Sequence, residues 1–167
     1  MGVSGAFNIK QKLPSKMYVG ISPLDTFDIQ FTTSQEYNSV LEHFEKINIT
    51  SDSRFLGIKE FLLEFLKKNG YKSGFKISLL VESQQGLGTG YISLAMSLLA
   101  VAVYLFTGKL EKKMLRKYDQ FLASEVFKEI LDFSKKLVDI PTNGNVYGAN
   151  NYVVFSNTSQ PQVYNQI

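Results

Sequence analysis

The chain has 167 residues, of which 44% are hydrophobic and 20% are charged, and its formal net charge at pH 7 is +3. This length and composition suit one domain with a real core, and the small net charge indicates neither disorder nor a nucleic-acid-binding surface. The absence of cysteine excludes disulfides and thiolate metal sites, and the single histidine, His43, cannot build a histidine-based zinc site.

Short segments near the N-terminus alternate apolar with other residues, which is typical of strands with one buried face. They cover residues 7–10, 17–21 and 27–31. Pro14 and Pro23 lie between them and favour turns, because proline cannot donate a hydrogen bond to a strand ladder.

Helical periodicity follows over residues 34–48 and, more clearly, over 53–69. Ser53 can cap the start of the second helix and Gly70 its end. One face of this helix is predicted to carry its apolar residues, Phe55, Ile58, Leu62 and Phe65.

A strand over residues 75–81 leads into a glycine-rich segment at 84–90 and then into a strongly apolar helix at 91–106. A membrane span is the competing interpretation of this helix. Its apolar part is shorter than the roughly 20 residues that a bilayer core requires, and Ser93 and Ser97 interrupt it. We therefore expect a buried core helix.

After Gly108 the apolar spacing predicts one long or two shorter amphipathic helices over residues 110–138. A basic cluster lies around the start of this region and is expected to be a solvated face: Lys109, Lys112, Lys113, Arg116 and Lys117. Residues 139–151 lose periodicity, a last strand is predicted at 152–155, and residues 157–167 form a polar tail.

These blocks predict one domain over residues 1–156 with an α+β fold. Its mainly antiparallel sheet packs in two layers against helices at about 53–69, 91–107 and 110–138. No segment of signal-peptide type begins the chain, so we expect a cytoplasmic protein with neither membrane nor nucleic acid as a partner.

The glycine-rich segment predicts an anion site. A strand, a turn and a helix start in direct succession leave backbone N–H groups unpaired, and glycines let a phosphate approach them. Gly86, Gly88 and Gly90 supply this pattern, and Thr89 adds a hydroxyl for Mg²⁺ or phosphate. The alternative interpretation, which the spacing supports equally well, is that the glycines only permit tight packing of the strand against the helix.

Two common phosphate motifs are excluded. A P-loop needs a lysine at the end of the turn, and none occurs between Lys76 and Lys109. A dinucleotide fingerprint needs a glycine where Tyr91 stands.

Residues 82–95, which read ESQQGLGTGYISLA, resemble the central motif of the galactokinase, homoserine kinase, mevalonate kinase and phosphomevalonate kinase (GHMP) superfamily. Residues 13–19 look like that family's N-terminal strand, and their sequence is most similar to that of phosphomevalonate kinase. Residues 141–146 occupy the place of its third motif, and Phe106 to Gly108 fit the end of its central helix.

This resemblance implies the family's N-terminal fold, which is similar to the ribosomal protein S5 domain 2-like fold. It also implies ATP and Mg²⁺ as cofactors, and phosphoryl transfer to a small metabolite such as mevalonate or phosphomevalonate. A C-terminal kinase domain, in the same or another chain, is the implied partner. The positions that match the motifs are Gly86, Leu87, Gly88, Thr89 and Gly90 for the phosphates, Thr89 and Glu82 for the metal, and Lys16 and Asn145 for catalysis.

The chain departs from the family at several of these positions. Glu82 and Gln84 replace a proline and a glycine, Gly90 replaces a serine, and Asn145 stands where most members place a catalytic aspartate. We therefore expect no turnover of ATP by this chain alone. A non-catalytic binding or assembly module that retains the fold is the alternative function.

Overall fold

The structure is a computed structural model that describes residues 5–8, 16–31, 53–82, 91–142 and 162–165. The chain divides into two compact units. We call Ser15–Gln84 the sheet unit, and Met1–Pro14 together with Gln85–Ile167 the helical unit. The helix predicted at 34–48 and the strand predicted at 152–155 lie outside the described residues. The domain boundaries drawn from the sequence, 1–156 and 157–167, stay predictions.

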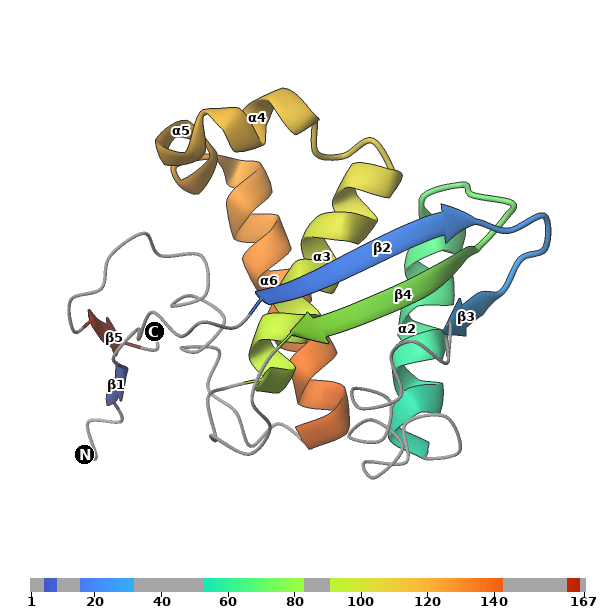
Figure 1. Ribbon diagram of the computed structural model, residues 1–167, viewed down its shortest axis with the longest axis horizontal. Helices are drawn as coiled ribbons and strands as arrows, with labels where there is room; N and C mark the ends of the chain where they lie inside the picture. The colour runs from blue at the N-terminus through green and yellow to red at the C-terminus, as the bar shows by residue number, and fades with distance from the viewer. Residues whose placement is uncertain (1–4, 9–15, 32–52, 83–90, 143–161, 166–167) are drawn as a thin grey trace. The chain divides into compact units, whose positions relative to one another are not determined.

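The sheet unit holds a three-stranded sheet in the order β2-β4-β3 (Figure 1). β2 (Lys16–Pro23) and β4 (Phe75–Glu82) are antiparallel, whereas β3 (Ile29–Phe31) runs parallel to β4. α2 (Ser53–Lys68) lies between β3 and β4 in the chain. Parallel neighbours need such a crossover, because the chain must return to the same end of the sheet before the next strand begins.

The strand predictions depended on period-two alternation, and the described side chains follow it. On β4, Phe75 and Ile77 are buried, whereas Lys76 and Ser78 are half-buried. On β2, exposed and half-buried residues alternate from Tyr18 to Ser22. The α+β class is therefore confirmed, with a sheet that combines antiparallel and parallel pairs.

α2 supplies helical residues to the core of the sheet unit. Ile58, Leu62 and Leu66 are buried, which is the spacing of one helix face. Phe65, which was predicted for this face, lies about 20° from Ile58 around the helix and is half-buried, and Leu66 adds a further buried position.

Gly70 ends α2, as the sequence predicts. Its φ of 77° is in the left-handed region that favours glycine. The Tyr71 N–H donates to the Leu66 carbonyl at 3.0 Å and the Gly70 N–H to the Lys67 carbonyl at 3.1 Å. This pair of bonds is the Schellman motif, which satisfies carbonyls that the helix end leaves unpaired.

A tight turn joins β2 to β3 and closes around Gly74, just before β4. The Gly74 N–H donates to the Thr26 carbonyl at 2.8 Å, and the Leu24 N–H donates to the Gly74 carbonyl at 3.0 Å. The Phe75 N–H donates to the Asp28 carbonyl at 3.0 Å. A Cβ at position 74 would overlap the backbone of Asp28, so only glycine fits there.

An ion pair joins this turn to α2. The Lys59 Nζ lies 2.6 Å from an Asp28 carboxylate oxygen, and each side chain is about one-third exposed. The hydrogen bond from Lys59 holds the pKa of Asp28 below its ordinary value of 3.8, against the opposing effect of partial burial. The ionised carboxylate is therefore favoured by folding.

We expect this pair to contribute to stability in full above about pH 4 and to lose that contribution as the pH falls further. The sign follows because the pKa of Asp28 is lower in the folded state, so the unfolded chain binds the proton first. Urea unfolding between pH 7 and pH 3 measures the effect as the difference between the wild type and Asp28→Asn. Asp25→Asn, which removes a charge from the same turn, is the matched control. A constant difference across this range would contradict the prediction.

In the helical unit, α3 (Tyr91–Phe106) and α6 (Glu125–Thr142) pack against each other. The rings of Tyr104 and Phe133 meet edge to face at 5.5 Å between centroids. Burial, with the charges of Glu129 and Asp132, raises the pKa of Tyr104 to about 12, so its hydroxyl stays protonated at neutral pH.

The prediction of a buried core helix at 91–106 is confirmed. Its buried positions include two serines, and they are Ser93, Ala95, Met96, Ser97, Leu99, Ala100, Val103 and Tyr104. Gly108 follows the helix with a φ of 69°. None of the helices in the described part of the chain combines the length and apolar character needed to cross a membrane.

The expectation of one or two helices over 110–138 was wrong, because the structure has three: α4 (Lys112–Arg116), α5 (Tyr118–Leu122) and α6. Lys117 separates the first two, with φ −108° and ψ 64°. Ser124 directly precedes α6 and caps its start, since the Ser124 Oγ accepts the Phe127 N–H at 3.2 Å. A serine in this position satisfies an N–H that would otherwise have no partner, so it favours a new helix start.

The C-terminal region also differs from the prediction. α6 continues to Thr142, beyond the end predicted at 138, and Val138 is buried. The supposed polar tail contains β5 (Gln162–Asn165), which pairs antiparallel with β1 (Gly5–Asn8). Pairing between chain ends is a long-range event that local polarity does not reveal.

Candidate functional site

Two of the residues predicted for the site meet at one end of the sheet. Lys16 is the first residue of β2 and Glu82 is the last residue of β4, and the two are Cα partners in the antiparallel register. Because the strands run in opposite directions, the start of β2 and the end of β4 share the same end of the sheet (Figure 1).

The length of the pairing makes this register specific. It extends without interruption from Lys16↔Glu82 to Pro23↔Phe75 and sets Ile21 opposite Ile77. A slip by one residue would move every side chain of a strand to the other face, which would expose the buried set of β4. The juxtaposition of Lys16 and Glu82 therefore depends on the apolar pattern of the whole strand pair.

The glycine-rich segment begins directly after this point in the chain. β4 ends at Glu82 and α3 begins at Tyr91, so the predicted order of strand, glycine-rich segment and buried helix is confirmed at both flanks. The predicted phosphate-binding residues themselves, Gly86, Leu87, Gly88, Thr89 and Gly90, lie outside the described residues, and so does Asn145.

The start of α3 carries no negative charge that would oppose an anion. Its first turn carries no acidic residue, so no carboxylate there opposes a phosphate. A helix of 16 residues also has the positive end of its dipole at that terminus.

Glu82 is the one predicted metal ligand whose place in the backbone is described. No group of three or more potential ligands, counting His, Asp and Glu, gathers among the described residues. Mg²⁺ commonly binds proteins through only one or two carboxylates, with water and substrate phosphates completing its shell.

Comparisons with family models, with curated proteins and with solved structures found no match to this chain. The arguments for a function therefore come from the residues and their arrangement.

The pairing of Lys16 with Glu82 was not predicted from the sequence. The motif resemblance implies Lys16 for catalysis and Glu82 for the metal, without relating the two. A signal was present, because the alternating segments 16–23 and 75–82 can be aligned in antiparallel register. Choosing β2 as the partner of β4 nevertheless requires the tertiary structure, since β3 is adjacent in the chain and pairs with β4 as well.

Proposed function

We propose that this chain binds the phosphates of ATP, together with Mg²⁺, through its glycine-rich segment at 84–90, as the N-terminal part of a GHMP-type small-molecule kinase. The observation that supports this most is the run from β4 through that segment into the buried helix α3. The motif resemblance over residues 82–95 supports the same site.

In this proposal the backbone N–H groups of residues 86–90 bind phosphate oxygens, and the Thr89 hydroxyl binds Mg²⁺ or a phosphate. Lys16 supplies positive charge. Its register position opposite Glu82 answers the main objection from the sequence, which is that a carboxylate near the loop repels phosphates. A cationic neighbour offsets that repulsion, and Mg²⁺ turns the carboxylate into a ligand.

Phosphoryl transfer depends mainly on positioning and charge neutralisation, so a site without a catalytic carboxylate still has a route to activity. Asn145 cannot act as a general base, and Gly90 lacks the hydroxyl of the family's serine. We therefore propose that the chain binds Mg·ATP but does not transfer phosphate to mevalonate, phosphomevalonate, homoserine or galactose on its own.

The second candidate is a non-catalytic binding or assembly module with the same fold. The departures at Gly90 and Asn145 favour it. The two candidates separate on turnover: ADP release that depends on a metabolite supports a kinase, whereas nucleotide binding without turnover in any assembly supports the module.

Titration of the full chain with Mg·ATP, followed by amide NMR shifts, tests the site. We expect saturable shifts at residues 84–91 and at Lys16 and Glu82, with an affinity no weaker than millimolar. Gly88→Ala should weaken binding at least about tenfold, because a methyl group holds a phosphate away from the backbone N–H groups. Lys16→Ala should weaken it through loss of charge.

Gly20→Ala is the matched control, since Gly20 lies on β2 and a Cβ there would make only ordinary contact with Ser78 at 3.8 Å. It should leave the affinity unchanged. Absence of shifts at millimolar Mg·ATP, or shifts confined to residues outside 84–91, would show that the glycines serve packing alone.

A further inference from the structure

The positive charge of the chain is concentrated in nine residues. Residues 109–117 hold five of the 18 lysines and arginines and one of the 15 acidic residues. Their formal charge is thus +4, whereas the rest of the chain carries −1. We call these five cations the basic ridge: Lys109, Lys112, Lys113, Arg116 and Lys117. The small net charge of the whole chain conceals this asymmetry.

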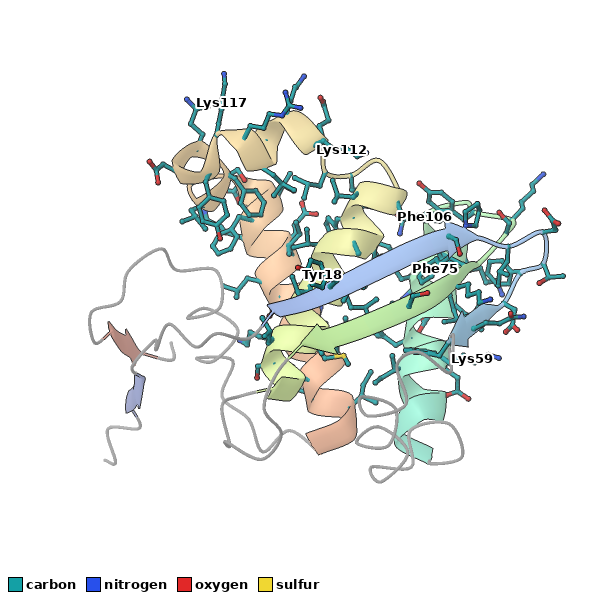
Figure 2. All side chains as sticks on the ribbon, in the orientation of Figure 1. Tyr18, Lys59, Phe75, Phe106, Lys112 and Lys117 are labelled. Atoms are coloured by element: carbon teal, nitrogen blue, oxygen red, sulfur yellow. The ribbon has the colours of Figure 1, made fainter. Side chains whose placement is uncertain are left out.

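All five side chains of the basic ridge are exposed. Lys112, Lys113 and Arg116 are on α4. A rotation of 100° per residue about the helix axis puts them within about one-third of its circumference. Met114 and Leu115 take the remaining arc and are half-buried. Figure 2 labels Lys112, the first residue of this helix, and Lys117, which directly follows it.

Acidic residues offset only part of this charge. Glu111 pairs with Lys113 at 2.6 Å, and both side chains are largely exposed. Asp119, on α5, is the next acid along the chain. An exposed pair of this kind is weak and exchanges readily for a stronger anion.

Buried residues on either side hold the basic ridge in place. Leu110 precedes α4 and is 3% exposed, and Phe121 on α5 is fully buried. The cations are therefore presented on an ordered scaffold of two short helices. Less backbone entropy is lost on binding than when a flexible basic tail becomes ordered.

We propose that the basic ridge binds the phosphate backbone of duplex nucleic acid without regard to sequence. Four of its five cations are lysines, which act as point charges toward phosphate, and a duplex carries one negative charge per roughly 1.7 Å of its axis. The proposal is independent of the nucleotide site at 84–90.

Two other polyanions fit the described surface less well. Unpaired strands are commonly held by exposed aromatic rings, and membrane-surface helices by apolar side chains that enter the lipid. The large hydrophobic side chains that are exposed among the described residues are Tyr18 and Phe27, and both belong to the sheet unit. The basic ridge thus offers charge without a stacking or inserting group, which favours a duplex backbone.

Fluorescence anisotropy of the full chain with a labelled duplex of about 20 base pairs tests this. Glu111 partly neutralises Lys113, and Lys109 has a further interaction of its own. About three contacts, from Lys112, Arg116 and Lys117, should therefore give a slope of log affinity against log salt near −3. Removing these three charges in Lys112→Gln, Arg116→Gln, Lys117→Gln should bring the slope close to zero. At 50 mM salt this variant should weaken binding more than 100-fold.

The control variant removes three exposed lysines of the sheet unit, Lys67→Gln, Lys68→Gln, Lys72→Gln, and has the same net charge. It should change the affinity less than about threefold, and circular dichroism should show both variants folded. Equal losses in the two variants, or no duplex binding at 50 mM salt, would overturn the proposal. So would tighter binding to an unpaired oligonucleotide, or to vesicles that contain phosphatidylserine, than to the duplex.

Discussion

Gly74→Ala is expected to lower the free energy of unfolding by about 4 kcal/mol or more, which is at the extreme of single substitutions. The added Cβ would overlap the carbonyl oxygen of Asp28 and come too close to its carbonyl carbon and its nitrogen. Backbone atoms cannot move aside as the end of a flexible side chain can. The turn must therefore open.

Opening this turn breaks the hydrogen bonds that Gly74 makes with Leu24 and Thr26. It also separates Asp28 from Phe75, where β3 and β4 begin their parallel pairing. Each buried backbone group that loses its partner costs about 1–3 kcal/mol, so the losses add to the steric term.

Urea unfolding followed by circular dichroism measures this prediction. Gly20→Ala is the control, because its Cβ has room and alanine is favoured over glycine in a strand by about 0.5–1 kcal/mol. The control should be as stable as the wild type or slightly more stable. If the free energy of unfolding of Gly74→Ala were within about 1 kcal/mol of that of the control, the predicted overlap with Asp28 would be contradicted.

Phe121→Ala is expected to cost about 3–5 kcal/mol. Phe121 is fully buried on a helix of only five residues. Its ring meets Phe127 edge to face at 5.4 Å and Tyr118 at 5.8 Å between centroids. Removal of the ring leaves a cavity and also ends two aromatic contacts, each of which is worth about 0.5–1.5 kcal/mol.

The neighbouring Leu122→Ala is the matched control, because Leu122 lies on the same helix and is only half-buried. It should cost about 1 kcal/mol, since less apolar area is lost. Chemical denaturation gives both values. Hydrogen exchange adds a local test: the Phe121 amide, which donates to the Lys117 carbonyl at 2.9 Å, should exchange faster in Phe121→Ala. Equal costs for the two variants would contradict the role given to Phe121.

Much of the secondary structure could be predicted because it depends on local spacing. The helices α2 and α3 and the strand β4 lie within a residue or two of their predicted ends. The break at Lys117 was missed, because the apolar spacing continues through it in register. The new start at Ser124 was readable from a serine followed by the acidic residue Glu125, but periodicity outweighed it.

The order of the candidate site's elements along the chain was predictable from the sequence, but the spatial arrangement of its residues was not. Glycine spacing between a strand and an apolar helix locates the proposed anion-binding segment from sequence alone. The position of Lys16 opposite Glu82 depends on which strand pairs with β4 and in which register. Residues 66 positions apart in the chain come together only when non-local pairing compensates the entropy of closing that loop.

The sequence by itself determined the α+β class, the buried helix at 91–106 and the glycine-rich segment, because composition and periodicity act over a few residues. Tertiary structure decided the strand order β2-β4-β3, the placing of Lys16 opposite Glu82 and the closure of the turn on Gly74. The physical reason is one of range. Local preferences select helix or strand, whereas burial and pairing between distant segments select which faces meet and which are left for other molecules.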